Sequence, residues 1–372
     1  MKIAILKKDY SENGGGAERY ARQVCRALAK RKHDVFVYSQ TFSESCPDGI
    51  NHVKVSKNNF AGCSATAAFH NSVQKVLRRC DYDIVYALSR TYPSDFYRVT
   101  ESLHCEWMKI RYPRYQLYNP RHMGILNLER KIFNPQNSGI IICNSELTRR
   151  QVILNFSFPE ERIKVVRNGV DHQEFMPANE FEKGEIRKRL ELPEDKFIVF
   201  FAASDFRIKG LANALKAVSM LPAPIKSKTL LLIAGGGSVC EYRRLADSLK
   251  VSGNLFFAGR IAKVRDYYVS SDILIHPTLY EPFANVCLEA LACGLPVLTT
   301  RTNGASELIK EGENGFTVTS ASDEDEMAGL LAKFAELSSD ARAKFSIRAL
   351  ESVAHLNWDL HIDNLLQLFS LK

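Results

Sequence analysis

The sequence has no CxxC pair among its nine cysteines and no cluster of His and Cys, so it indicates neither a zinc site nor a disulfide framework. It has no apolar stretch near the roughly 20 residues that span a bilayer, and MKIAILKK at its start lacks the apolar length of a signal peptide. The GxGxxG pattern that nicotinamide-dependent oxidoreductases need is also missing. These absences favour a cytoplasmic protein with free thiols that is not a dehydrogenase.

The size and charge of the chain indicate two domains with different partners. Its 372 residues are too many for one ordinary core, and 45% hydrophobic and 25% charged residues are typical of soluble globular proteins. Residues 1–167 carry 27 Lys and Arg against 15 Asp and Glu, a net +12, whereas the remainder carries 23 against 27. The basic part predicts an anionic membrane surface or a phosphorylated acceptor as partner, and solvated charge without a partner is the plain alternative. Nucleic acid ranks last, because no nucleic-acid-binding module is recognisable.

Short apolar runs alternate with helical patterns in both halves of the chain. The expected strands are residues 3–6, 35–38, 83–86, 139–143, 197–202, 229–234, 254–257, 273–276 and 296–299. Residues 172–194 are charged and lack strand character, which predicts a linker. This alternation predicts an α/β protein with two Rossmann-like, doubly wound domains that face each other across a cleft. We place the domains at 1–170 and 171–355. We also expect a closing helical segment at 349–369, and the C-terminal residues 356–372 could pack back on the first domain.

Residues 276–300 carry two carboxylates, Glu281 and Glu289, around the expected start of a helix. Pro282 fits the first turn of that helix, and Gly294 ends it. Three backbone N–H groups are expected to be unpaired at the helix start, those of Phe283, Ala284 and Asn285. Donors and carboxylates that face one crevice suit a polyhydroxylated ligand. A helix cap and a solvated Glu are the plain alternative.

Two loops that follow expected strands carry groups suited to a phosphate, and a third loop carries a candidate arginine. Gly15 and Gly16, in a run of three glycines that begins at residue 14, precede the first expected helix and let the backbone approach a ligand closely, although a tight turn explains them as well. Arg207 and Lys209 follow another strand and could both point at one diphosphate, or form a solvated basic loop. Arg260 follows a third strand, where a surface salt bridge is an equal alternative.

The first half holds one further polar segment. Glu101 and His104 lie close together in the sequence, and a neutral His suits donation to a ligand hydroxyl, although a lone His is more often structural. Residues 107–121 mix aromatic and basic side chains as an interfacial patch does, and ordinary core and surface residues would look similar. Asp81 and Asp83 form a DxD string, which we interpret as the end of a helix before a strand rather than a metal site.

The order of these motifs resembles that of glycosyltransferase family 4, which has the GT-B fold. Glu281 and Glu289, with Pro-Phe after the first and ALACGLPV after the second, resemble its nucleotide-sugar motif. The glycine run with AER resembles its GGxER loop, and NGASE at 303–307 matches a further motif, in which Asn303 replaces a more usual Gly. Residues 98–107 resemble a segment of the transferases related to lipopolysaccharide core glucosyltransferase I, with Thr100 and Ser102 where glycine is usual.

This resemblance implies a retaining hexosyltransferase that needs no metal or other cofactor and works by front-face attack. The donor would be a nucleotide-sugar, UDP-glucose in our prediction, bound by the second domain. The acceptor would be a lipopolysaccharide inner core or similar glycolipid, bound by the first domain, with the protein at the inner face of the cell membrane. Domain closure would be absorbed near residues 170–195. A transferase for another cell-surface polysaccharide and a non-catalytic sugar-nucleotide-binding protein are the alternatives.

The resemblance also implies a role for each candidate residue. Arg207 and Lys209 would neutralise the diphosphate, Arg260 would contact the base, and Gly15 and Gly16 would lie over the diphosphate. Glu281 would hold hydroxyls of the donor sugar and Glu289 the ribose, while the N–H groups near Phe283, Ala284 and Asn285 would orient the sugar. The catalytic candidates are Glu101 and His104 of the first domain and Glu281 of the second.

Overall fold

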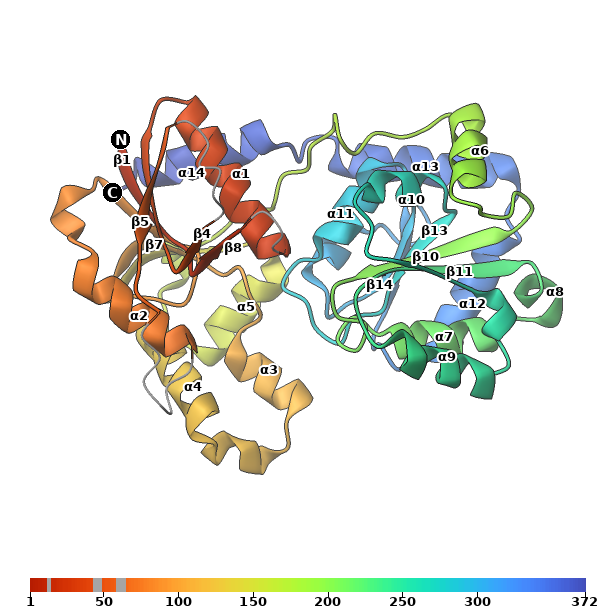
Figure 1. Cartoon of the computed structure of the whole chain (residues 1–372), viewed down its shortest axis with the longest axis horizontal. Helices are drawn as coiled ribbons and strands as arrows, with labels where there is room; N and C mark the ends of the chain where they lie inside the picture. Colours follow the sequence, from red (N-terminus) through yellow and green to blue (C-terminus); the bar gives the residue numbers. More distant parts are fainter. Residues whose placement is uncertain (12–14, 43–48, 58–64) are drawn as a thin grey trace. The chain divides into compact units, whose positions relative to one another are not determined.

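The computed structural model describes residues 1–372 apart from 12–14, 43–48, 58–64 and the side chain of Arg79. The chain forms two compact units (Figure 1). Unit 1 consists of Met1–Gly169 and Trp358–Lys372, and unit 2 consists of Val170–Asn357. Gly14 of the glycine run lies outside the described residues.

Unit 1 is built on a parallel sheet of seven strands in the order β5-β3-β1-β6-β7-β8-β9. Its strands are β1 (Lys2–Leu6), β3 (Asp34–Ser39), β5 (Ile50–Lys54), β6 (Ile84–Ala87), β7 (Ser94–Arg98), β8 (Ser138–Cys143) and β9 (Ile163–Val165). A separate parallel pair joins β2 (Asp9–Tyr10) to β4 (Thr41–Phe42). The helices are α1 (Gly16–Lys30), α2 (Ala65–Val76), α3 (His104–Arg111), α4 (Pro120–Ile132), α5 (Glu146–Asn155) and α14 (Trp358–Phe369), with 3-10 turns η1 (Arg79–Asp81), η2 (Arg114–Tyr118) and η3 (Glu160–Arg162).

Helices cover both faces of this sheet, which explains why its strands are apolar on both sides. In β1, Ile3 and Ile5 pack with α1 and α14 on one face, whereas Ala4 and Leu6 pack with α2, α4 and α5 on the other. The C-terminal helix α14 packs on α1, where the Tyr20 hydroxyl lies 2.9 Å from His361 Nε2. The C-terminal residues therefore contribute to the core of unit 1.

Unit 2 is built on a parallel sheet of six strands in the order β12-β11-β10-β13-β14-β15. Its strands are β10 (Phe197–Ala203), β11 (Thr229–Gly235), β12 (Leu255–Gly259), β13 (Ile273–His276), β14 (Val297–Thr300) and β15 (Gly315–Val318). The helices are α6 (Glu180–Arg189), α7 (Leu211–Ser219), α8 (Ala223–Lys226), α9 (Val239–Ser248), α10 (Val264–Val269), α11 (Asn285–Ala292), α12 (Glu324–Ala335) and α13 (Ser339–Val353), with 3-10 turns η4 (Ser252–Asn254) and η5 (Gly304–Leu308).

The predicted fold class, two Rossmann-like parallel α/β sheets, is confirmed. In each sheet the strand order reverses once, between β1 and β6 in unit 1 and between β10 and β13 in unit 2. Ligands of such sheets bind outside the carboxyl ends of the strands at this switch point. The loops after β1, β6, β10 and β13 are therefore the places to search for a site.

Two local predictions were wrong. The predicted linker contains helix α6, which belongs to unit 2 because Lys183 and Arg187 pair with the nearly buried Asp272 at 2.9 and 3.0 Å. The closing helical segment is broken, since α13 ends at Val353 and α14 starts at Trp358.

The two aspartates of the DxD string end a turn and anchor the N-terminal strand. Asp81 ends η1, and Asp83 Oδ2 accepts a hydrogen bond from the Lys2 backbone N–H at 2.7 Å. No group of three or more His, Cys, Asp or Glu side chains suited to a metal occurs in the described part of the chain. In that same part, every helix is too short or too polar to traverse a lipid bilayer.

Candidate functional site

The loops after β10 and β13 touch each other at the switch point of unit 2. The Leu279 N–H donates to the Ile208 carbonyl at 3.2 Å. Gly210 has a φ of +81°, and a Cβ there would lie 2.0 Å from the Pro277 carbonyl oxygen, so only glycine fits. This close approach brings Lys209 of the first loop against Glu281 of the second, where Nζ and Oε2 form an ion pair.

Lys209 is a mostly buried cation in a preformed loop. Its side chain is 19% exposed, and burial lowers its pKa to about 8. The direct contact with Glu281 favours the charged form, so we expect a charged pair near neutral pH. Asp205 shapes the loop, because its Oδ1 accepts the N–H groups of Arg207 and Ile208 at 3.0 and 3.2 Å.

Two exposed arginines accompany Lys209 at this edge of the sheet. Arg207 shares its loop, and Arg260 follows β12. A Cβ on Gly236, in the loop after β11, would lie 3.6 Å from Arg260 Nε and 3.7 Å from the Ser204 carbonyl, so these loops are adjacent. Among the residues that the structure describes, neither arginine has an ion-pair partner. The salt-bridged alternative for Arg260 is therefore not observed there.

The loop between β13 and α11 differs from its prediction. α11 begins at Asn285, so Pro282 precedes the helix instead of lying in its first turn. The Ala284 N–H is not free, because it donates to Asn303 Oδ1 at 3.1 Å. The prediction of an unpaired Ala284 donor was therefore wrong, since a distant side chain caps this turn. Phe283 and Ala284 are 4% and 5% exposed.

Asn303 is the hub of this loop. Its Oδ1 also accepts the Ala305 N–H at 3.1 Å, and its Nδ2 donates to Thr299 Oγ1 at 3.0 Å and to Cys287 Sγ at 3.4 Å. Glu281 lies directly beside it, because the Glu281 N–H donates to Thr302 O at 3.1 Å and the Gly304 N–H to Glu281 O at 2.9 Å. The fully buried Asn303 side chain thus ties the Ala284 N–H, just before α11, to β14 and η5.

Glu289 lies on α11, one turn after Asn285, and is 8% exposed. Its Oε2 accepts a hydrogen bond from the Tyr268 hydroxyl at 2.9 Å. Burial, followed by the charge of Glu289, raises the pKa of Tyr268 well above its ordinary value, so Tyr268 stays a donor. Tyr268 therefore fixes the orientation of the carboxylate.

The switch point of unit 1 also carries paired charges. Lys7, which follows β1 and is 2% exposed, pairs with Glu18 of α1 at 3.0 Å. Gly15 and Gly16 are exposed, and α1 starts at Gly16 without a side-chain cap. An uncapped helix start with small residues leaves its N–H groups accessible to an anion.

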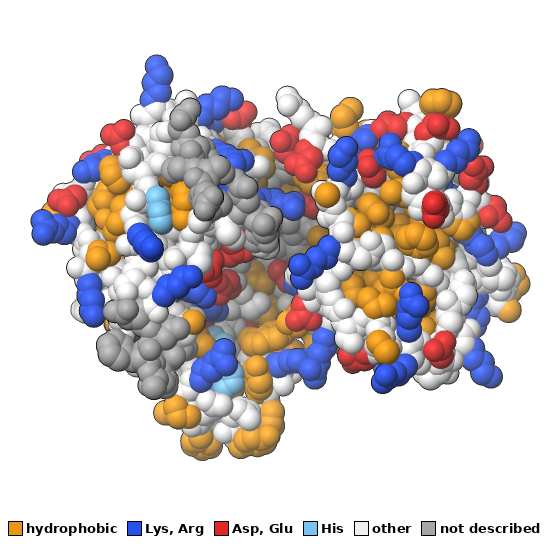
Figure 2. All heavy atoms as spheres, in the orientation of Figure 1, with side chains coloured by type: hydrophobic (Ala, Val, Ile, Leu, Met, Phe, Trp, Pro, Cys, Tyr) orange, Lys and Arg blue, Asp and Glu red, His pale blue; other side chains and the backbone are white. Residues whose placement is uncertain are grey.

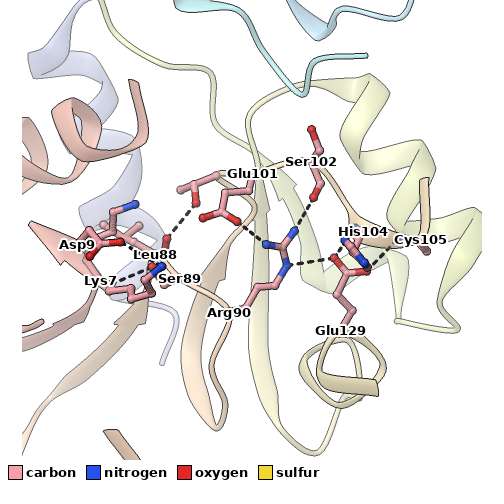
Figure 3. Close-up of polar contacts among 12 residues, drawn as sticks. Lys7, Asp9, Leu88, Ser89, Arg90, Glu101, Ser102, His104, Cys105 and Glu129 are labelled. Carbon is pink, nitrogen blue, oxygen red and sulfur yellow. Dashed lines mark hydrogen bonds and ion pairs between the residues drawn. The ribbon is translucent and has the colours of Figure 1, made fainter. Parts of the chain in front are cut away.

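Glu101 and His104 lie near this switch point (Figure 3). Glu101 forms an ion pair with Arg90, which follows β6. Burial would raise the pKa of Glu101, but the charges of Arg90, Lys7 and Lys8 outweigh it and lower the pKa. His104 Nε2 lies 3.0 Å from His122 Nδ1, and burial, with Arg90 and His122, lowers the His104 pKa to about 4. His104 is therefore neutral at pH 7.

Two family models match this chain, one on each part. Residues 14–174 match the model described as Glycosyltransferase Family 4, and residues 182–352 match Glycosyl transferases group 1. The chain belongs to the GT-B glycosyltransferases of family 4. It is 25% identical to lipopolysaccharide glucosyltransferase WaaG of Escherichia coli over 326 residues, 86% of each chain.

Solved structures of glycosyltransferases share this fold. A crystal structure of WaaG, a glycosyltransferase involved in lipopolysaccharide biosynthesis, matches with a TM-score of 0.87 and 22% identity over 99% of both chains. HepE of Anabaena in complex with UDP-glucose matches with a TM-score of 0.76 and 18% identity over the whole of both chains. The chain is thus a glycosyltransferase related to WaaG.

Several residues of this glycosyltransferase could not be found from the sequence. Arg90 and Glu129 contact Glu101 and His104, yet they come from the end of β6 and from α4. Asn303 and Tyr268 contact the loop and helix of the paired glutamates from equally distant positions. Of these four residues, only Asn303 could have been noticed in the sequence, because it departs from the expected family motif.

One surface of unit 1 is both apolar and basic, and we call it the η2 surface. Its exposed apolar side chains are Ile110, Tyr115, Leu117, Tyr118 and Met123, of which Tyr118 is 81% exposed. Its exposed basic side chains are Lys109, Arg114 and Arg121. Figure 2 shows hydrophobic side chains gathered over the part of unit 1 where Figure 1 labels α3 and α4. Trp107 and Tyr112 of the predicted patch are half-buried.

Proposed function

We propose that this glycosyltransferase moves glucose from UDP-glucose to a lipopolysaccharide inner core or similar glycolipid, with retention and without a metal. The observation that carries the proposal is the Lys209–Glu281 ion pair at the switch point of unit 2, flanked by Arg207 and Arg260. Neighbouring cations and a carboxylate suit a sugar diphosphate, because such a donor carries both negative charge and hydroxyl groups. HepE, which has the same fold, is known in complex with UDP-glucose.

The pair would exchange partners when the donor binds. Diphosphate oxygens would replace Glu281 as the partner of Lys209, while Arg207 would add a forked pair of hydrogen bonds. The released Glu281 carboxylate would then accept hydroxyls of the sugar, and Glu289, held by Tyr268, would accept those of the ribose. The Lys209–Glu281 ion pair would thus keep both charges compensated until each gains a partner on the donor.

The chemical step needs stabilisation of the leaving group. The bond from the anomeric carbon to the diphosphate breaks, the acceptor oxygen bonds to that carbon from the same face, and its proton passes to the departing diphosphate. Negative charge grows on the diphosphate, and removal of one preorganised donor to such a charge typically costs 10²–10³-fold in rate. Lys209 and Arg207 would supply the positive charge that opposes it, so the proposal requires no metal.

The acceptor would bind to unit 1 near Glu101 and His104. Because the pKa of His104 is lowered to about 4, its imidazole would be neutral and would orient the acceptor hydroxyl through a hydrogen bond. The η2 surface would contact an anionic membrane, since aromatic and apolar side chains enter the lipid interface while Lys and Arg attract anionic headgroups. Such contact would bring a glycolipid acceptor to the enzyme.

The test is a transfer assay with UDP-glucose and other UDP-sugars, using truncated lipopolysaccharide as acceptor, with excess EDTA in one arm. We expect transfer with UDP-glucose that depends on acceptor and persists in EDTA, with an α-linkage seen by NMR. Inversion at the anomeric carbon, a strict metal requirement, or UDP-glucose binding without transfer to any glycolipid would each contradict the corresponding part of the proposal.

Membrane contact is tested by co-sedimentation with vesicles. Binding should be stronger to vesicles with 30% or so anionic lipid than to zwitterionic vesicles, and should weaken with salt. A Tyr115→Ser, Tyr118→Ser double variant should lose most of it. The matched control is Phe181→Ser, because Phe181 is a similarly exposed aromatic residue (80%) of unit 2. Equal binding by all three proteins would remove the η2 surface from the proposal.

A further inference from the structure

We infer that Arg90 and Glu129 are positioning residues of the acceptor side, which hold Glu101 and His104 in place without touching substrate. The inference rests on the proposed function, in which those two residues contact the acceptor. Figure 3 shows that the four side chains converge from three separate segments of unit 1. The contacts among them define one chain of interactions, from α4 through Arg90 to the loop before α3.

Glu129 anchors the start of helix α3 from outside that helix. The residue before α3 is Leu103, whose side chain has no acceptor, so the first N–H groups need another partner. Glu129 Oε1 accepts the His104 N–H at 2.6 Å, and Oε2 accepts the Cys105 N–H at 3.1 Å. A carboxylate at a helix N-terminus also opposes the positive end of the helix dipole. The backbone of His104 is therefore fixed by a residue of α4.

The carboxylate of Glu129 is nearly inaccessible, at 1% exposure. Burial raises its pKa, and Arg90 together with the two N–H groups acts in the opposite direction. A buried carboxylate that loses its partner is strongly destabilising, so Glu129 and Arg90 need each other. This excludes a role for Glu129 as an acid or base that meets substrate.

Arg90 links Glu129 to the segment that carries Glu101. Its Nε donates to Glu129 Oε1 at 3.2 Å, its Nη1 to Glu101 Oε2, and its Nη2 to the Ser102 carbonyl at 2.6 Å. The guanidinium is planar, so hydrogen bonds to three partners in three directions fix its orientation. The fixed guanidinium in turn holds these three partners in position. Its side chain is 12% exposed, which leaves it inside this network.

Two hydrogen bonds tie the loop after β7 to the loop after β6. The Thr100 hydroxyl donates to the Leu88 carbonyl at 2.9 Å, and the Ser102 backbone carbonyl accepts from Arg90. The first contact needs a hydroxyl, so the glycine that the resemblance leads us to expect at 100 could not make it. The second uses the backbone, so it would be present with any residue at 102.

The experiment compares Arg90→Lys, Arg90→Ala and Glu129→Gln with wild type. Lys keeps the charge but cannot reach three partners, and Gln places an amide N–H against a backbone N–H. We expect kcat/KM for the acceptor to fall at least 10-fold in all three. The Kd for UDP-glucose and the slow hydrolysis of UDP-glucose without acceptor should stay within twofold, because Lys209 and Glu281 belong to unit 2.

The matched control is Arg149→Ala, which removes an arginine that pairs with Glu160 on the surface of α5 at 3.3 Å. It should leave acceptor kinetics within twofold. A second readout is the NMR titration of His104, whose pKa should rise towards its ordinary value in Arg90→Ala because a nearby positive charge is lost. A role in folding alone would lower the melting temperature without this split between donor and acceptor.

Unchanged acceptor kinetics in a folded Arg90→Lys protein would overturn the inference, as would an equal loss of donor binding. If Arg90→Ala fails to fold, Arg90→Lys and Glu129→Gln decide. Failure of the proposed function would give a different result. The wild-type enzyme itself would then bind UDP-glucose without transferring glucose to truncated lipopolysaccharide.

Discussion

The two switch points have the same sheet topology but use charge in opposite ways. In unit 2, Lys209 has Glu281 as its partner, and Arg207 and Arg260 are exposed without an ion pair in the described part of the chain. In unit 1, by contrast, Lys7 pairs with Glu18, and Arg90 pairs with both Glu101 and Glu129. One edge thus keeps cations available for an anion, whereas the other uses its charges to shape a loop.

The loops at the two edges are also held by different kinds of hub. Asn303, a neutral side chain, fixes the loop of Glu281 through four hydrogen bonds. Arg90 and Glu129, two charged side chains, fix the loop of Glu101. A neutral hub does not compete for the diphosphate, which the cations of unit 2 are proposed to bind. The difference is therefore consistent with a donor site in unit 2 and an acceptor site in unit 1.

The largest expected effect is that of Lys209→Ala. Loss of a preorganised cation beside the leaving diphosphate should lower kcat by about 10²–10³-fold and weaken UDP binding. Steady-state kinetics and calorimetric titration with UDP measure both. The control is Lys188→Ala, which removes an exposed lysine that pairs with Glu185 at 3.4 Å. A loss below threefold would mean that the unit 2 cations do not serve the leaving group.

Glu281→Gln should separate nucleotide binding from transfer. In this variant the side chain at 281 is uncharged, so the diphosphate does not have to displace a carboxylate from Lys209. UDP alone should therefore bind several-fold tighter. Transfer should nevertheless fall by about 10- to 100-fold, because the amide holds sugar hydroxyls less well than the carboxylate. Weaker binding of UDP in this variant would show that the ligand-free ion pair does not oppose the diphosphate.

Asn303→Ala tests the neutral hub. It leaves two buried N–H groups and Thr299 Oγ1 without their partner, which should cost about 2–3 kcal/mol in the free energy of unfolding. Urea unfolding at low and high salt measures this loss, which should not depend on salt because no charge is removed. Asn51→Ala, at an exposed position of β5, is the control. A cost below 0.5 kcal/mol or so would mean that water replaces the side chain.

Acid should weaken unit 1 more than unit 2. In unit 1, burial lowers the pKa of His70 and His104 to about 4 and the pKa of His361 to about 3. In unit 2, burial lowers the pKa of His276 to about 3. Each such His takes up its proton in the unfolded state near pH 6.5 but much lower in the folded state. Stability is therefore lost as pH falls below about 6.5, by about 1 kcal/mol at pH 5.5 for each fully buried histidine and by less for the partly exposed His70.

Hydrogen exchange measures this difference in each unit. Peptides of β3 and β11 should be compared at pH 7 and 5.5 after correction for the intrinsic exchange rate. Protection should fall more in β3 than in β11. Equal losses would indicate that the buried histidines of unit 1 are not the groups that titrate on unfolding.

The sequence predicted the periodic features of this protein well. Apolar runs located β10, β11 and β13 within a residue or so. The family motifs brought Lys209 and Glu281 into one hypothesis, and the structure places them in contact. The sequence-based prediction failed for α6, because a charged helix that packs through Arg187 on the nearly buried Asp272 has the composition of a linker.

By itself, then, the sequence determined the two parallel α/β sheets, the family and the loops that carry the charged motifs, because strand periodicity and motif spacing are local properties of the chain. Tertiary structure alone decided the partners: Asn303 for Ala284, Tyr268 for Glu289, and Arg90 with Glu129 for the segment of Glu101 and His104. Those contacts join residues far apart in the chain, and burial makes each donor and acceptor find a partner wherever the packed elements supply one.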